Sequence, residues 1–146
     1  MKLINFKIAN DNIALTTSDY YFDLHNNYDL LSFEYQVKKR KFWISWIKSD
    51  EDWVDKRLPY KLKLEFTNTS FLKIKENEKD EFIKDDNCLE AIGFAECNMR
   101  DNMDSWLSEW REDDNYDLIF IFINGHAIKI NAETAELEIR LINNDN

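Results

Sequence analysis

Apolar side chains alternate with polar ones along two neighbouring stretches in the middle of the chain. Between residues 61 and 67 every second position is leucine or phenylalanine, and the positions between them are polar or charged. The same alternation resumes at residues 71–75, after the polar stretch Asn68-Thr69-Ser70. Because successive side chains of a strand point to opposite faces of a sheet, this pattern is typical of half-buried strands. It predicts that the two stretches form a β-hairpin.

A second pair of alternating stretches comes earlier in the chain. Apolar side chains occupy positions 31, 33 and 35 and then positions 42, 44 and 46, with a turn expected around residues 38–40. This pattern predicts another hairpin. In its second strand Trp43 and Ile47 make the opposite face apolar as well. That strand is therefore either a central strand or one with an exposed aromatic face.

The clearest turn lies near the C-terminus. A continuous run of β-branched and aromatic residues at 118–123 is followed by Asn124-Gly125 and then by an apolar stretch at 126–130. Asn-Gly suits the two positive φ angles of a type I′ turn, so we expect a hairpin here. Further strands are expected at residues 89–94 and 137–141.

One segment has helical rather than strand spacing. Met103, Trp106, Leu107 and Trp110 recur at intervals of three and four, and Asp101 or Asn102 could cap the helix. The spacing predicts an amphipathic helix over 102–112, and shorter helical turns are expected at 50–56 and 80–83. The expected fold class is α+β: mainly antiparallel sheet or sandwich built from hairpins, with at least this one short helix.

Composition limits the size and location of the protein. The 146 residues are 44% hydrophobic and include two glycines and one proline, so we expect a single domain over 1–146 without Gly- or Pro-rich linkers. The N-terminal residues do not resemble a signal peptide, and no run of about 20 apolar residues could cross a membrane. Two cysteines, Cys88 and Cys97, are too few for a disulfide framework. A cytoplasmic location is expected.

The chain is strongly acidic, with 29 Asp and Glu residues against 19 Lys and Arg and a net charge of -10. Such a charge repels nucleic acids and anionic membranes and favours encounter with a basic protein, although it is also common in proteins that are merely soluble. The basic run Lys38-Lys39-Arg40-Lys41 is the one feature that favours nucleic acid. At a hairpin tip, such a run is usually just solvated.

Candidate catalytic and metal-binding residues are few. The two histidines, His25 and His126, both lie beside expected turns, where solvated side chains are the rule. Residues 113–117 have the Asp-x-Asn-x-Asp spacing of a calcium loop, but Leu118 and Asn124 stand where that loop requires glycine and glutamate. With two glycines no phosphate-binding glycine loop can form. We therefore expect no enzyme activity, no metal and no cofactor.

Acidic residues concentrate in two stretches, 76–86 and 101–117, and aromatic residues are interleaved in the second. Carboxylates beside aromatic rings suit a surface that binds a basic protein, because charges steer the encounter and rings anchor it. The alternative is that Trp106 and Trp110 form the core-facing stripe of the expected helix. The residues expected to bind the partner are Asp104, Glu109, Glu112, Asp113, Asp114, Tyr116 and Asp117.

A set of strand and turn patterns extends over residues 42–141. It comprises Trp43-x-x-Trp46, Leu58-Pro59, Leu62-x-Leu64-x-Phe66, Leu89-x-x-Ile92-x-Phe94 and Phe120-x-Phe122-x-x-Gly125-x-x-Ile128-x-Ile130-x-Ala132-Glu133-x-Ala135-Glu136-Leu137. This set resembles small bacterial immunity proteins that are encoded beside polymorphic or contact-dependent growth inhibition toxins. The resemblance implies a protein that binds and blocks the toxic domain of a cognate effector, often a basic nuclease. It implies no catalytic residue and leaves the oligomeric state open.

Two alternatives remain at the level of sequence. One is a regulatory or ligand-binding module whose pocket is lined by Trp43, Trp46 and Trp53. The other is an enzyme that uses carboxylates alone, which 29 acidic residues do not exclude.

Overall fold

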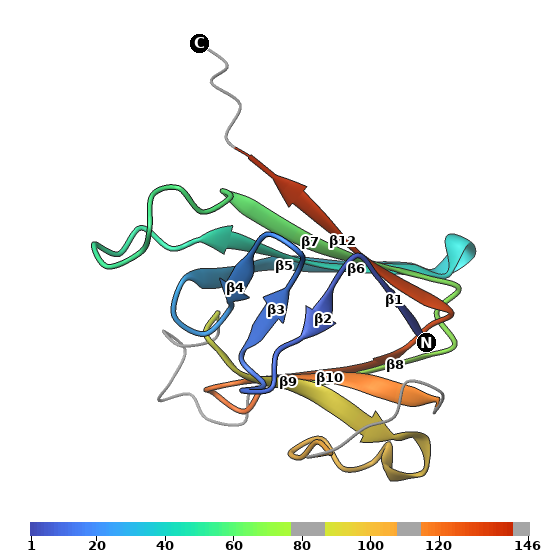
Figure 1. The fold of residues 1–146 in the computed structure, drawn as a ribbon. Coiled ribbons are helices and arrows are strands. Elements are labelled where there is room, and N and C mark those ends of the chain that lie inside the picture. Colours follow the sequence, from blue (N-terminus) through green and yellow to red (C-terminus); the bar gives the residue numbers. More distant parts are fainter. Residues whose placement is uncertain (77–86, 108–114, 142–146) are drawn as a thin grey trace.

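Two facing β-sheets form most of the protein in a computed structural model that describes residues 1–76, 87–107 and 115–141 (Figure 1). The larger sheet pairs β1 with β12 in parallel, and all its other neighbours are antiparallel. In spatial order its strands are β1 (Lys2–Ile4), β12 (Thr134–Arg140), β7 (Lys61–Thr67), β6 (Lys41–Lys48) and β5 (Tyr28–Gln36).

The second sheet is antiparallel throughout. Its strands, in spatial order, are β8 (Phe71–Lys75), β11 (Ala127–Asn131), β10 (Tyr116–Phe122) and β9 (Leu89–Glu96). A small third sheet of β2 (Lys7–Ile8), β3 (Ala14–Thr16) and β4 (Tyr21–Asp23) lies beside the gap between the two larger ones (Figure 1). It is tied to both, because the Asn5 side chain bonds the backbone of Leu137 and Asn12 bonds that of Ile92.

Apolar side chains from the facing sides of the two large sheets form the core. Trp46 and Phe66 of the larger sheet both pack against Phe120 of the second, at ring distances of 5.8 and 6.4 Å. The small sheet adds Leu15 and Phe22, which are completely buried. Each such side chain contributes about 1.5–3 kcal/mol by leaving water.

The predicted hairpin between residues 61–67 and 71–75 is wrong, although both stretches are strands. β7 pairs with β6 and β12, whereas β8 pairs with β11 in the other sheet. The connection crosses from one sheet to the other beside the link between β11 and β12, and Ser70 N–H donates to Asn131 O at 2.9 Å. Asn68 adopts a left-handed conformation, with φ at 54°, at this corner.

The other two predicted hairpins are confirmed. β5 and β6 are joined by the 3₁₀ turn η1 (Val37–Lys39), and β6 lies between β5 and β7, which confirms its interpretation as a central strand. β10 and β11 are paired as expected. Their turn differs from type I′, because Gly125 has a positive φ of 90° and Asn124 does not. Instead the Asn124 side chain accepts a hydrogen bond from the His126 N–H at 2.8 Å. The strands expected at 89–94 and 137–141 correspond to β9 and β12.

The predicted helix over 102–112 is wrong for residues 102–107, and residues 108–112 lie outside the described part. Within that part the only helical elements are the 3₁₀ turns η1 and η3 (Cys97–Met99). The fold is therefore mainly β rather than α+β. Residues 52–53 form a hydrogen-bonded turn, and the turn expected at 80–83 falls on residues that are not described. Among the described residues, no helix is long and apolar enough to cross a membrane.

Candidate partner-binding site

Residues 97–107, the covering segment, lie against the outer face of the second sheet. That face is apolar at its centre, where Ile119, Ile121 and Ala127 point away from the main core. Met103 of the covering segment packs on these side chains and is 5% exposed. Of the apolar residues whose spacing predicted a helix, Met103 is buried, Trp106 is 39% exposed, and Trp110 lies outside the described residues.

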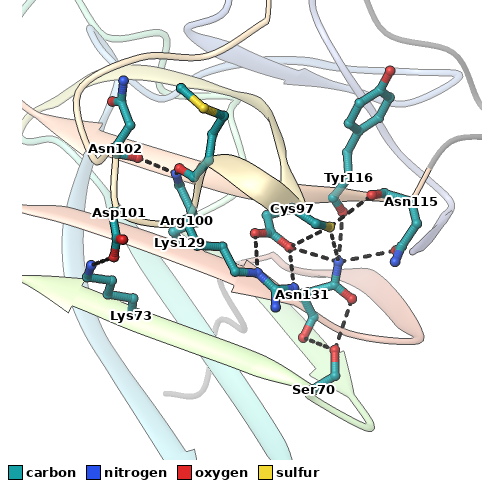
Figure 2. A network of polar contacts seen from close by, with 12 residues as sticks. Ser70, Lys73, Cys97, Arg100, Asp101, Asn102, Asn115, Tyr116, Lys129 and Asn131 are labelled. Carbon is teal, nitrogen blue, oxygen red and sulfur yellow. Dashed lines mark hydrogen bonds and ion pairs between the residues drawn. The ribbon is translucent and has the colours of Figure 1, made fainter.

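A buried carboxylate holds one end of the covering segment (Figure 2). The side chain of Asp117, on β10, is 0% exposed and forms two hydrogen bonds with the guanidinium of Arg100, at 2.9 and 3.0 Å. Asn131 Nδ2 donates to the same carboxylate at 2.9 Å, and Cys97 Sγ lies 3.3 Å from it. The Arg100 guanidinium also lies over the ring of Phe71, 4.0 Å from its centroid. This network joins β8, β10 and β11 to the covering segment.

The electrostatics of this network favour one protonation state. Burial alone would raise the pKa of Asp117, but hydrogen bonds from Arg100, Asn131 and Cys97 outweigh it and hold the pKa below the ordinary 3.8. Burial and the neighbouring carboxylate of Asp117 raise the pKa of the Cys97 thiol. A thiol that stays protonated is a poor nucleophile, so Cys97 is suited to donating hydrogen bonds.

A buried amine holds the middle of the covering segment. Lys129 of β11 has no exposed surface, and its Nζ donates to the backbone carbonyls of Met99, at 2.9 Å, and Asn102 (Figure 2). Burial lowers the pKa of this amine. At the edge of the sheet, ion pairs add two further links, Lys73–Asp101 at 3.1 Å and Lys75–Asp104 at 3.0 Å. The buried charges of Asp117 and Lys129 thus serve to hold the covering segment against the sheet.

The Asp117 network makes stability depend on pH. A carboxylate whose pKa is lowered by folding stabilises the fold fully above its unfolded pKa, and this contribution is lost as the pH falls through the lower, folded value. We expect the free energy of unfolding to fall as the pH drops below about 4. The measurement is urea unfolding at a series of pH values. The Asp117→Asn variant, which cannot titrate, should lose less stability over this range, and identical slopes would contradict the prediction.

The expected partner-binding residues do not form one surface in the described structure. Asp104 is exposed but paired with Lys75, Tyr116 packs its ring on Phe94 at 6.2 Å, and Asp117 is buried against Arg100. The remaining four lie outside the described residues: Glu109, Glu112, Asp113 and Asp114.

The three tryptophans of the alternative pocket are also kept apart. Trp46 is completely buried in the core, whereas Trp43 lies on the opposite face of β6, where Lys63 Nζ sits 4.9 Å from its ring centroid. Trp53 lies beyond the end of β6 and is exposed. These residues line no common pocket, so the geometry does not favour a ligand-binding module built on them.

Among the described residues, His25 and Cys88 come nearest to a catalytic pair. Their Nδ1 and Sγ atoms are 4.0 Å apart, but Nδ1 is also 2.5 Å from the carbonyl oxygen of Leu89. Nδ1 must carry a proton to make that hydrogen bond, so it cannot at the same time accept one from the thiol. Among the described residues, no group of three His, Cys, Asp or Glu side chains could hold a metal ion.

An acidic and aromatic loop joins β6 to β7 at one end of the larger sheet. We call residues 50–53 the Trp53 loop: Asp50, Glu51 and Asp52 precede Trp53, and all four are exposed. Trp53 is 69% exposed, whereas tryptophan side chains are highly buried on average. Within the described structure, none of the three carboxylates forms an ion pair or hydrogen bond, whereas nearby Asp55 is paired with Arg57. From the sequence, this stretch was expected to form a helical turn, and Trp53 was a candidate for lining a ligand pocket.

Contacts on both sides anchor the Trp53 loop to the rest of the protein. The Trp53 indole N–H donates to the Asn26 carbonyl at 3.2 Å, and the adjacent Val54 is buried. Further along, the buried Tyr28 hydroxyl donates to Pro59 O at 3.0 Å, and the Lys48 amine donates to two carbonyls of the same connection. A ring that is both exposed and fixed loses little freedom when a partner binds it.

Comparison with known proteins gives no relative. No protein-family model, no curated protein and no solved structure matches the chain.

Proposed function

We propose that this protein is an immunity protein, which binds a basic toxin domain and neutralises it without catalysis. The observation that carries the proposal is the Trp53 loop, an exposed tryptophan hydrogen-bonded to Asn26 beside three carboxylates that have no cationic partner among the described residues. The net charge of -10 gives the whole molecule the sign that a basic partner requires. The likeness of strand patterns to immunity proteins supports the same function.

The mechanism is steric and electrostatic. Carboxylates attract the basic partner and compete with phosphate groups for its cationic side chains. The ring of Trp53 then loses its contact with water, which supplies affinity that salt does not screen. The rigid sheets behind the loop favour this mechanism, because the binding surface needs little ordering.

The cytoplasm is the proposed location. Cys88 and Cys97 form no disulfide, as suits a reducing compartment. An immunity protein that acts there meets its toxin inside the cell that makes both.

The first test asks whether a toxic partner exists. The tagged full-length chain is used to capture proteins from the source organism, and each captured protein is identified and expressed alone and together with this chain. We expect a basic protein that stops growth when expressed alone and is tolerated when co-expressed. Failure to capture such a protein, or toxicity that co-expression leaves unchanged, would contradict the proposed function.

Replacing Trp53 by alanine should weaken binding of the captured toxin about 30-fold or more, because a central exposed tryptophan typically contributes at least 2 kcal/mol to an interface. Thermal stability should change little, since the ring is mostly exposed. Calorimetry or surface plasmon resonance measures the binding. The matched control is Ile123→Ala, which shortens another exposed apolar side chain, 40% exposed, in the turn between β10 and β11. Equal affinities of the two variants would exclude the Trp53 loop as the contact.

A further inference from the structure

In the described part of the chain, the edge of the larger sheet formed by β5 is long, apolar and uncovered beyond Leu30. β5 pairs only with β6, and in the described structure the one backbone hydrogen bond on its other side is from Leu30 N–H to Asn87 O. From that point to the turn, four large apolar side chains are exposed: Leu31 (47%), Phe33 (36%), Tyr35 (38%) and Val37 (70%). Only Glu34 interrupts them with a charge. Such an edge readily pairs with another strand.

The other edges of the two large sheets are protected. β1 is three residues long, and β8 carries Lys73 and Lys75 in ion pairs. β9 is covered on its outer side, where Ile92 N–H donates to Asn12 O and Leu107 N–H donates to Phe94 O, both at 2.7 Å. Charges, short strands and covering chain are the usual means of preventing edge-to-edge association. Among the described residues, β5 beyond its bulge at Leu30–Ser32 has one charge, Glu34, and no covering chain, which distinguishes this edge as an interaction surface.

The two ends of the β5 edge carry opposite charges. At the turn, Lys38 and Lys39 are exposed, and neither is in an ion pair or hydrogen bond within the described residues. At the other end lie Asp29, on β5, and Asp50, just beyond β6, and these carboxylates likewise have no partner there. A strand of nine residues separates these ends by about 30 Å, several times the distance over which salt screens charges. The ends therefore act as separate charged sites.

We propose that two copies of this chain associate through β5, with their β5 strands antiparallel, to form a dimer with a continuous sheet. Antiparallel pairing brings the basic end of each copy to the acidic end of the other, and does so twice because the contact is symmetric. It also covers the apolar side chains that β5 exposes. A strand from a basic partner fits this edge less well, since it would meet Lys38 and Lys39.

The inference goes beyond the proposed function and is tested on the purified chain alone. Light scattering should give twice the mass of one chain for the wild type. The Lys38→Glu/Lys39→Glu variant has acidic groups at both ends, and the Asp29→Lys/Asp50→Lys variant has added basic groups at the acidic end. Each should dissociate, with a dimer Kd raised about tenfold or more by like-charge contacts. Mixed in equal amounts, the two variants should form a heterodimer, which native mass spectrometry distinguishes from either homodimer.

Two controls keep the test decisive. Lys2→Glu/Lys7→Glu makes the same change in net charge at exposed lysines outside β5 and should remain dimeric. Leu31→Gln/Val37→Gln removes exposed apolar groups without changing charge and should also weaken the dimer. The inference is overturned if the wild type is a monomer at high concentration, if either charge variant remains as dimeric as the wild type, or if mixing the two yields no heterodimer. Restored association on mixing would itself show that both variants are folded.

Discussion

The Asp117→Ala variant is expected to unfold with a free energy about 2–3 kcal/mol lower than that of the wild type. Removing the carboxylate leaves the Arg100 guanidinium without its ion pair and the buried Asn131 amide without one acceptor. The Arg100 side chain is 35% exposed and keeps part of its hydration, and the Asn131 amide still donates to Tyr116 O at 3.1 Å, so the penalty is that of partial rather than complete loss of partners. Urea unfolding followed by tryptophan fluorescence measures it.

The matched control for this prediction is Asp104→Ala. Asp104 also forms an ion pair with a basic side chain, but 77% of its side chain is exposed, so we expect a loss of no more than about 1 kcal/mol. If the two substitutions lowered the free energy of unfolding by similar amounts, burial would not be the reason that the Asp117 ion pair stabilises the fold. Because Arg100 belongs to the covering segment, Asp117→Ala should also make residues 97–107 more accessible to proteases than the rest of the chain.

Strand positions could be predicted from the sequence because, where apolar and polar residues alternate, the apolar ones identify the side chains that are buried on folding. Pairing was predictable only where the connecting residues form a local turn, as between β5 and β6 or between β10 and β11. It failed between β7 and β8, because Asn68-Thr69-Ser70 can close a hairpin or carry the chain to another sheet. Which of these occurs depends on the hydrogen bond from Ser70 to Asn131 and on the pairing of β12 with β7. Both involve residues that are distant in sequence from this connection.

The covering segment shows why the helix prediction failed. The helix was predicted from the spacing of Met103, Trp106, Leu107 and Trp110, but an irregular segment covers the outer face of β10 in its place. A helix that began at residue 102 would use the Asn102 carbonyl in its own hydrogen bonds, whereas here that carbonyl and the one of Met99 accept from the buried amine of Lys129. This amine lies on β11, remote in sequence from the segment that it holds. Local spacing of apolar residues could not reveal that contact.

The candidate site was only partly accessible to sequence reasoning. The rule that carboxylates beside aromatic rings suit a basic partner was applied to residues 101–117, where Asp117 is in fact buried. The same rule describes residues 50–53, where three carboxylates directly precede Trp53. What distinguishes the two is exposure, and exposure of Trp53 depends on Asn26 and on a buried neighbour, Val54. Both are tertiary contacts.

Trp46→Ala is the second substitution with a large expected effect, a loss of about 3–5 kcal/mol in the free energy of unfolding. Trp46 is completely buried and packs on Phe120 from the opposite sheet, so alanine leaves a cavity between the sheets. Its indole Nε1 is buried and has no hydrogen-bond partner among the described residues. An unpaired buried N–H costs about 1–3 kcal/mol, so part of the stabilisation by this ring is already offset in the wild type.

Trp46→Phe separates these two contributions. Phenylalanine keeps most of the apolar contact with Phe120 and removes the unpaired N–H, so the loss of packing and the relief of the polar group should nearly cancel. We expect the free energy of unfolding to lie within about 1 kcal/mol of the wild-type value, against several for alanine. Chemical unfolding followed by circular dichroism compares the three proteins. A phenylalanine variant as unstable as the alanine variant would mean that the indole N–H is bonded in solution, and that Trp46 stabilises the sandwich by a polar contact as well as by packing.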